Sequence, residues 1–239
     1  MSRQSPSSSE RRSFLTYLNG GIASLVALAA GSSAMAQEKA RAAALEKARW
    51  EPARHDKDDW LDELPGKHRL IFDTSTPEGV GDAILFAGNF LRVNRTDYGL
   101  QDSDLAVIIV VRHRSTPFGY KDAMWAKYGS ALAEHAAPFE DPKTKTTPRV
   151  NVYNSGDYGS LLSSRGTTLE SLCKRGVQLA VCSSATRATA GAAAKESGGN
   201  IDAIYAELTA NLLTNGRMVP AGIVAVSRAQ ERGYSLVKT

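Results

Sequence analysis

The fold is decided by a short stretch in the second half of the chain. It runs Gly176-Val177-Gln178-Leu179-Ala180-Val181-Cys182-Ser183-Ser184-Ala185-Thr186-Arg187. The apolar run after Gly176 is typical of a buried strand, and a serine directly after Cys182 can cap a following helix. Cys182 is therefore predicted to lie at the carboxyl end of a strand and the amino end of a helix. In an open α/β sheet, ligands bind at that edge.

Two roles are open to Cys182. The dipole and the free N–H groups of a following helix favour the thiolate, which is the reactive form of cysteine. Unpaired cysteine is also among the residue types most often buried as a small apolar side chain. Its place in the chain alone does not decide between a reactive thiol and a core residue.

Strands and helices alternate on both sides of this stretch. Strands are expected at 68–73, 105–111, 177–181, 218–226 and 234–237, with a short edge strand at 150–153. Helices are expected at 80–93, 121–134, 168–174, 202–213 and 227–232, with an alanine-rich one from Cys182 to the glycines at 198–199. Residues 136–160 form a polar loop of the kind that is often functional or mobile. The alternation predicts an α/β fold, with a parallel sheet and helices on both faces.

Residues 1–36 have the pattern of a twin-arginine export signal. Arg11-Arg12-Ser13-Phe14-Leu15 precedes a weakly apolar run at 22–30, and Ala34-Met35-Ala36 offers a cleavage site. The apolar run is shorter than the roughly 20 residues of a membrane-spanning helix. We expect cleavage after about Ala36, a periplasmic mature protein and no stable membrane span. The alternative is an uncleaved membrane anchor.

The charge balance gives no indication of a nucleic-acid partner. The chain has 29 basic and 25 acidic residues, and residues 1–36 contain three of the former and one of the latter. The mature chain is left with a net charge of about +2, too small for a basic binding surface. Residues 37–66, rich in Ala, Lys, Glu and Arg, are predicted to be a helical arm in front of a domain at 67–239.

The two cysteines, Cys173 and Cys182, are not expected to form a disulfide. Cys173 precedes the strand at 177–181, and Cys182 follows it. Because a strand extends by about 3.3 Å per residue, we expect the two Cα atoms to lie farther apart than the roughly 7 Å that a disulfide allows. The chain has no Cys-x-x-Cys pair, which disfavours a redox enzyme. It also has no glycine-rich phosphate motif, so no cofactor is predicted.

Further side chains are predicted to reach the crevice beside Cys182. They are Asp73 and Thr74 after the first strand, Arg112 and His113 after the second, and Ser183, Ser184, Thr186 and Arg187 after the third. The hydroxyl groups can donate hydrogen bonds to a thiolate, and the basic groups can add positive charge. Each group also has an ordinary explanation, because Arg187 and His113 suit a solvated surface and Asp73 suits a strand-end cap.

Three other kinds of chemistry have weaker support at this edge. Asp73 with Glu78 could form a proton-transferring acid pair. A serine hydrolase would need a base placed beside Ser183, and the sequence provides none. His113 and His135 lack the spacing typical of metal ligands, so no metal site is predicted.

Residues 67–239 resemble the DsrE/DsrF-like family. The resemblance is carried by the strands at 68–73 and 104–113, by Cys182 with Arg187 five residues later, by Val219-Pro220-Ala221-Gly222-Ile223-Val224 and by Gln230-Glu231-Arg232-Gly233-Tyr234. It implies a single flavodoxin-like domain with about five mostly parallel strands, and a homo-oligomer. In the sulfur-relay branch of the family a cysteine carries sulfur as a persulfide, and Cys182 matches that cysteine. The loop at 136–160 and the export signal depart from the small cytoplasmic relay proteins.

Two functions are expected on these grounds. In the first, Cys182 is a carrier or transferase of persulfide sulfur, supplied by a donor protein and passed to an acceptor thiol. The alternative is a non-catalytic periplasmic module of the same fold that binds a small ligand or assembles oligomers. Whether the chain is an enzyme stays open.

Overall fold

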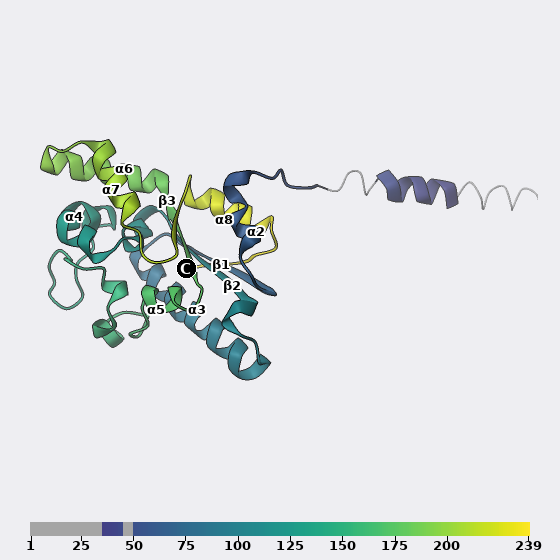
Figure 1. Ribbon diagram of the computed structural model, residues 1–239, viewed down its shortest axis with the longest axis horizontal. Coiled ribbons are helices and arrows are strands. Elements are labelled where there is room, and N and C mark those ends of the chain that lie inside the picture. The colour runs from purple at the N-terminus through teal and green to yellow at the C-terminus, as the bar shows by residue number, and fades with distance from the viewer. Residues whose placement is uncertain (1–34, 45–49) are drawn as a thin grey trace, which may run out of the picture. The chain divides into compact units, whose positions relative to one another are not determined.

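The computed structural model describes residues 35–44 and 50–239 (Figure 1). They fall into two units, residues 1–53 and 54–239. In the first unit, residues 35–44 are an exposed helix that begins in the last two positions of the predicted export signal and continues into the predicted helical arm, and Trp50 is exposed. The predicted export signal lies outside the described residues, except for its last two positions.

The second unit is built on a five-stranded sheet in the order β4-β3-β2-β1-β5. Its strands are β1 (His68–Thr74), β2 (Leu105–Val111), β3 (Gln178–Cys182), β4 (Gly216–Val219) and β5 (Ser235–Lys238). All four strand pairings are parallel. Its α-helices are α2 (Trp60–Glu63), α3 (Pro77–Tyr98), α4 (Asp122–His135), α5 (Leu169–Cys173), α6 (Ser183–Ser197), α7 (Ile201–Ala210) and α8 (Gly222–Gln230). The predicted flavodoxin-like α/β fold is confirmed.

The central strand β2 separates two hydrophobic cores. All seven of its residues are buried, as expected of a parallel strand that is covered on both faces. Val107, Ile109 and Val111 face the larger core with residues of α3 to α7, whereas Ala106, Ile108 and Val110 face a smaller core with α2 and α8. This division follows from the two-residue period of a strand. Figure 1 shows α2 and α8 next to each other.

The prediction of an edge strand at 150–153 is wrong. Val152–Asn154 is a 3-10 turn instead, and both Val152 and Tyr153 are buried in the larger core. The side chain of Asn151 fixes this turn, because its Nδ2 donates to the carbonyls of Phe118 and Tyr120 at 2.8 and 2.9 Å. The loop is therefore anchored to the core at this point by a buried amide.

The prediction of a strand at 218–226 is also wrong for the second half of that range, which is helical. β4 ends at Val219, and α8 begins at Gly222. Pro220 has no N–H group to continue a strand ladder. In α8, Ala225, Val226 and Ala229 are buried, which is helical spacing.

Within the described residues, no helix has both the length and the apolar character needed to cross a membrane.

Candidate functional site

A cavity of about 410 Å³ lies at the carboxyl edge of the sheet. It is lined by Arg112, His113, His135, Cys182, Ser184, Ala185, Ala188, Ala221, Gly222 and Ile223. Val111 of β2 pairs with Val181 of β3, so the residues that follow them come out side by side. Four of the predicted site residues, Arg112, His113, Cys182 and Ser184, are thereby brought together in one cavity.

Cys182 is both the last residue of β3 and the residue that precedes the first turn of α6. It is 6% exposed. Its backbone is fixed by Thr186, whose hydroxyl donates to the Cys182 carbonyl at 2.9 Å and accepts from the Tyr120 hydroxyl at 2.7 Å. Burial raises the pKa of Tyr120, so this hydroxyl keeps its proton. Thr186 therefore holds the peptide of Cys182, and its one proton is not available to the thiol.

Arg112 contributes a fixed positive charge to the cavity. Its Nε and Nη2 donate to the two carboxylate oxygens of Asp73 at 2.6 and 2.8 Å. The hydrogen bond to Asp73 raises the pKa of Arg112 above its ordinary value. Asp73 is thus the ion-pair partner that orients Arg112, and its carboxylate is not free to act in an acid pair.

Thr74 is fully buried and does not line the cavity. Its Oγ1 lies 2.7 Å from the Val110 carbonyl oxygen and 2.9 Å from Ser115 Oγ. The N–H of Arg112 also donates to Ser115 Oγ, at 2.8 Å. These bonds fix the ends of β1 and β2. Ser115, three residues after Arg112, was not predicted, because no pattern in the sequence indicates that it is buried.

The two histidines at the cavity are joined through the backbone. His113 adopts a left-handed conformation, with φ of 54°. Its carbonyl lies 2.9 Å from His135 Nε2, and because a carbonyl only accepts, Nε2 carries the proton. Among the residues that the structure describes, no cluster of His, Cys, Asp and Glu could hold a metal ion.

The stability of the protein is expected to fall below about pH 6.5 because of His135. Burial lowers the pKa of His135 below its ordinary value of 6.5, so the unfolded chain takes up a proton that the folded chain resists. Thermal unfolding midpoints between pH 5 and 8 would measure this. In His135→Gln, the fall between pH 6.5 and the lowered pKa should be smaller, and an unchanged profile would contradict the assignment.

Ser183, Ser184 and Arg187 are separated by the turn of α6. Arg187 pairs with Asp202 of α7 at 2.6 Å, and its guanidinium lies 5.3 Å from the ring centroid of Tyr205. The Ser183 hydroxyl is 2.7 Å from the Tyr205 hydroxyl. Ser184 donates to the carbonyl of Pro220 at 3.1 Å. Of these three, only Ser184 lines the cavity, so the arginine that shares its lining with Cys182 is Arg112.

Gly222 is a site residue that the sequence did not reveal. A Cβ atom built on it would lie 2.5 Å from the Cβ of Arg112 and 3.0 Å from Val110 Cγ1. The first turn of α8 can approach the cavity only because this residue lacks a side chain. Its place after Pro220-Ala221 would have been informative if the helix had been expected to begin there.

Both cysteines are free and buried. Cys173 lies in the larger core on α5, and burial raises its pKa to about 12. It is absent from the cavity that Cys182 lines. The two thiols therefore have different surroundings.

Comparison with known proteins adds little to this geometry. No protein-family model and no curated protein matches the chain. The structure of a protein of unknown function from Methanobacterium thermoautotrophicum is similar over 72% of this chain and 100% of that chain, with 14% identity and a TM-score of 0.36. The resemblance to the DsrE/DsrF-like family therefore stays a prediction.

Proposed function

We propose that this chain is an exported member of the DsrE/DsrF-like family that carries sulfur as a persulfide on Cys182. The observation that supports this most is that Cys182 and Arg112 line the same cavity at the carboxyl edge. Arg112 is held by Asp73 and stays charged, and its Nη1 makes no hydrogen bond to a described residue, so it can donate to a negatively charged sulfur on Cys182. A persulfide carrier needs such stabilisation both before and after it accepts sulfur.

The transfer step exchanges one sulfur–sulfur bond for another. The thiolate of Cys182 attacks the outer sulfur of a donor persulfide, R–S–SH. The donor S–S bond breaks, its electron pair leaves on the donor sulfur as a thiolate, and Cys182 becomes Cys–S–SH. An acceptor thiolate then removes the outer sulfur in the same way and restores Cys182. The exchange consumes no external oxidant or reductant.

The walls of the cavity suit this exchange. Ala185, Ala188 and Gly222 are small, which leaves space beside the sulfur. The weakly polar surroundings strengthen the attraction between Arg112 and an anionic sulfur, because fewer water molecules screen it. Since Cys182 is almost fully buried, the donor sulfur has to enter the cavity.

A second candidate function is a periplasmic binding or assembly module, in which Cys182 stays unreactive. It is favoured by the exposed apolar side chains of Ile223 and Val224 on α8, the first of which lines the cavity and is 56% exposed. Exposed apolar groups beside a cavity suit contact with a second subunit or a partner protein. A homo-oligomer is compatible with both functions.

The two functions can be separated by the intact mass of the mature protein after incubation with a polysulfide donor. Sulfur transfer predicts a gain of about 32 Da for each sulfur atom, which a reducing agent removes. Peptide mapping after alkylation should place that sulfur on Cys182. No gain, together with alkylation of Cys182 only after unfolding, would contradict sulfur transfer and favour the binding module.

A further inference from the structure

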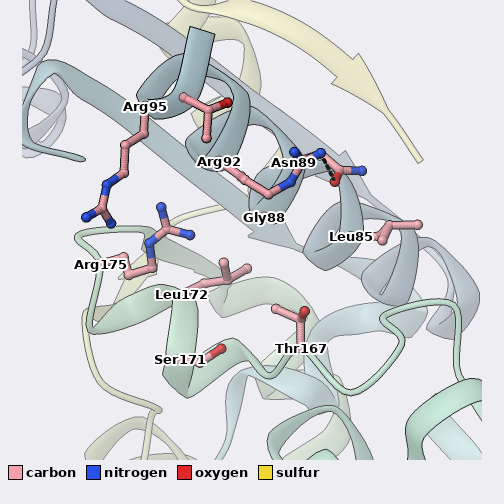
Figure 2. Close-up of a pocket in the computed structure, with 10 residues that line it drawn as sticks. Leu85, Gly88, Asn89, Arg92, Arg95, Thr167, Ser171, Leu172 and Arg175 are labelled. Atoms are coloured by element: carbon pink, nitrogen blue, oxygen red, sulfur yellow. Dashed lines mark hydrogen bonds between the residues drawn. The ribbon is translucent and has the colours of Figure 1, made fainter. Parts of the chain in front are cut away.

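A second cavity, of about 470 Å³, lies between α3 and α5 (Figure 2). It is lined by Leu85, Gly88, Asn89, Arg92, Arg95, Thr96, Thr167, Ser171, Leu172 and Arg175. None of these residues lines the cavity of Cys182. Arg95 lies in the last turn of α3, and Arg175 comes three residues before β3 begins. Since α3 starts after the carboxyl end of β1, this cavity belongs to the opposite, amino edge of the sheet.

The lining of this cavity has a strong excess of positive charge. It contains three arginines and no acidic residue. Arg175 is paired with Asp102, just outside the lining, through two hydrogen bonds of 2.9 Å each. Those bonds lower the pKa of Asp102, so its carboxylate is charged and offsets one of the three arginines. The cavity is left with a net charge of +2.

Several guanidinium donors in the cavity have no partner within the described protein. The pair with Asp102 uses Nε and Nη2 of Arg175 and leaves Nη1 without a hydrogen bond to a described residue. Arg95 makes no hydrogen bond to a described residue, although its charge interacts with the nearby carboxylate of Asp102, and Arg92 has only a 3.4 Å contact with Asn89 Oδ1. Figure 2 shows the guanidinium groups of Arg95 and Arg175 pointing toward each other. Two like charges in this arrangement favour an anion between them, and the forked guanidinium suits phosphate oxygens.

The rest of the cavity offers space for an apolar group. Leu85 and Leu172 contribute apolar side chains, and Gly88 contributes none. A Cβ atom built on Gly88 would have only Thr167 Cγ2 within 4 Å, at 3.9 Å. The volume also exceeds what a bare phosphate ion fills, and lies in the range of pockets for small molecules.

We propose that this cavity binds a small phosphate monoester. Its phosphate group carries a charge of about −1.5 to −2 at pH 7, which matches the net charge of the arginines and Asp102. The phosphate lies between Arg95 and Arg175, and the organic group lies over Gly88 against Leu85 and Leu172. Arg95 also suits the C-terminal end of α3, where cations interact favourably with the helix dipole. That structural role does not require the open space at Gly88.

Isothermal titration of the protein with phenyl phosphate, at fixed ionic strength in chloride, tests the proposal. We expect phenyl phosphate to bind at least tenfold more tightly than inorganic phosphate and benzoate. Arg95→Gln should weaken this binding tenfold or more, because it removes a charged hydrogen-bond donor. Arg149→Gln, a change of the same kind at an exposed arginine outside this cavity, should leave it unchanged.

Gly88→Leu separates shape from charge. This variant keeps every arginine, but its side chain points across the cavity toward Thr167. We expect it to abolish binding of phenyl phosphate while the unfolding temperature stays the same or rises, because leucine favours a helix more than glycine does. Unchanged affinity in Gly88→Leu or Arg95→Gln would overturn the proposal. Equal affinity of the wild-type protein for phenyl phosphate and benzoate would also overturn it. Equal affinity for phenyl phosphate and inorganic phosphate would contradict the inference that the ligand is an ester with an organic group.

Discussion

Cys182→Ser is expected to reduce sulfur loading from a polysulfide donor to the level of a blank without protein. A serine hydroxyl stays protonated at neutral pH and does not take up sulfur by thiol exchange, so the substitution removes the reacting atom while nearly preserving its size. The fold should survive, because the Cys182 carbonyl that accepts from the Thr186 hydroxyl is a backbone group, which the substitution leaves unchanged. The measurement is the intact mass after incubation, expressed per folded protein.

The chain contains its own control for this experiment. Cys173→Ala removes the other thiol, which lies in the larger core and whose pKa is raised to about 12 by burial. Because such a thiol is protonated at neutral pH, its loss should leave the added mass unchanged even if stability falls. The opposite pattern, with loading lost in Cys173→Ala and kept in Cys182→Ser, would show that Cys182 is not the carrier.

The sheet could be predicted from the sequence because its strands have unambiguous patterns. Residues 105–111 are a continuous apolar run, which in a parallel sheet means burial on both faces. The run at 218–226 is also continuously apolar, but this pattern did not identify its structure. Its residues are apolar at both strand and helix spacing, so periodicity did not reveal that a helix begins at Gly222.

The candidate site could be predicted only as far as strand order determines it. Arg112 and Cys182 line one cavity because they come directly after Val111 and Val181, which pair in adjacent parallel strands. Side-chain directions were not predictable, since they depend on partners far away in the chain. Asp73 is the partner of Arg112, and Arg187 turns to Asp202 of a later helix.

The arginines between α3 and α5 show a second limit. Arg92 and Arg95 are separated from Arg175 by 80 residues of sequence or more, and no motif joins them. They converge because α3 returns to the amino edge of the sheet, where α5 leads into β3. Only the packed structure brings their charges together.

Asp73→Ala is expected to lower the free energy of unfolding by about 3 kcal/mol, which is the lower end of the range for breaking a buried ion pair. The side chain of Asp73 is 7% exposed and that of Arg112 is 23% exposed. Removing the carboxylate leaves a charged guanidinium in a largely dry place, although water reaches part of it. Urea unfolding at pH 7 would measure the change. The control is Asp202→Ala, which breaks an ion pair whose carboxylate is 75% exposed and should cost less than about 1 kcal/mol.

The same substitution separates the structural role of the ion pair from its role at Cys182. Without Asp73, Arg112 loses both hydrogen bonds that orient it, so sulfur loading should slow down even in the folded fraction. The double variant Asp73→Leu with Arg112→Met replaces the pair by apolar groups of similar volume. It should recover much of the stability, because no charge is left unpaired, but none of the loading rate, because the positive charge beside Cys182 is gone. If the double variant loaded sulfur as fast as the wild-type protein, Arg112 would only support the fold, and the stabilisation of an anionic sulfur would have to come from elsewhere in the cavity.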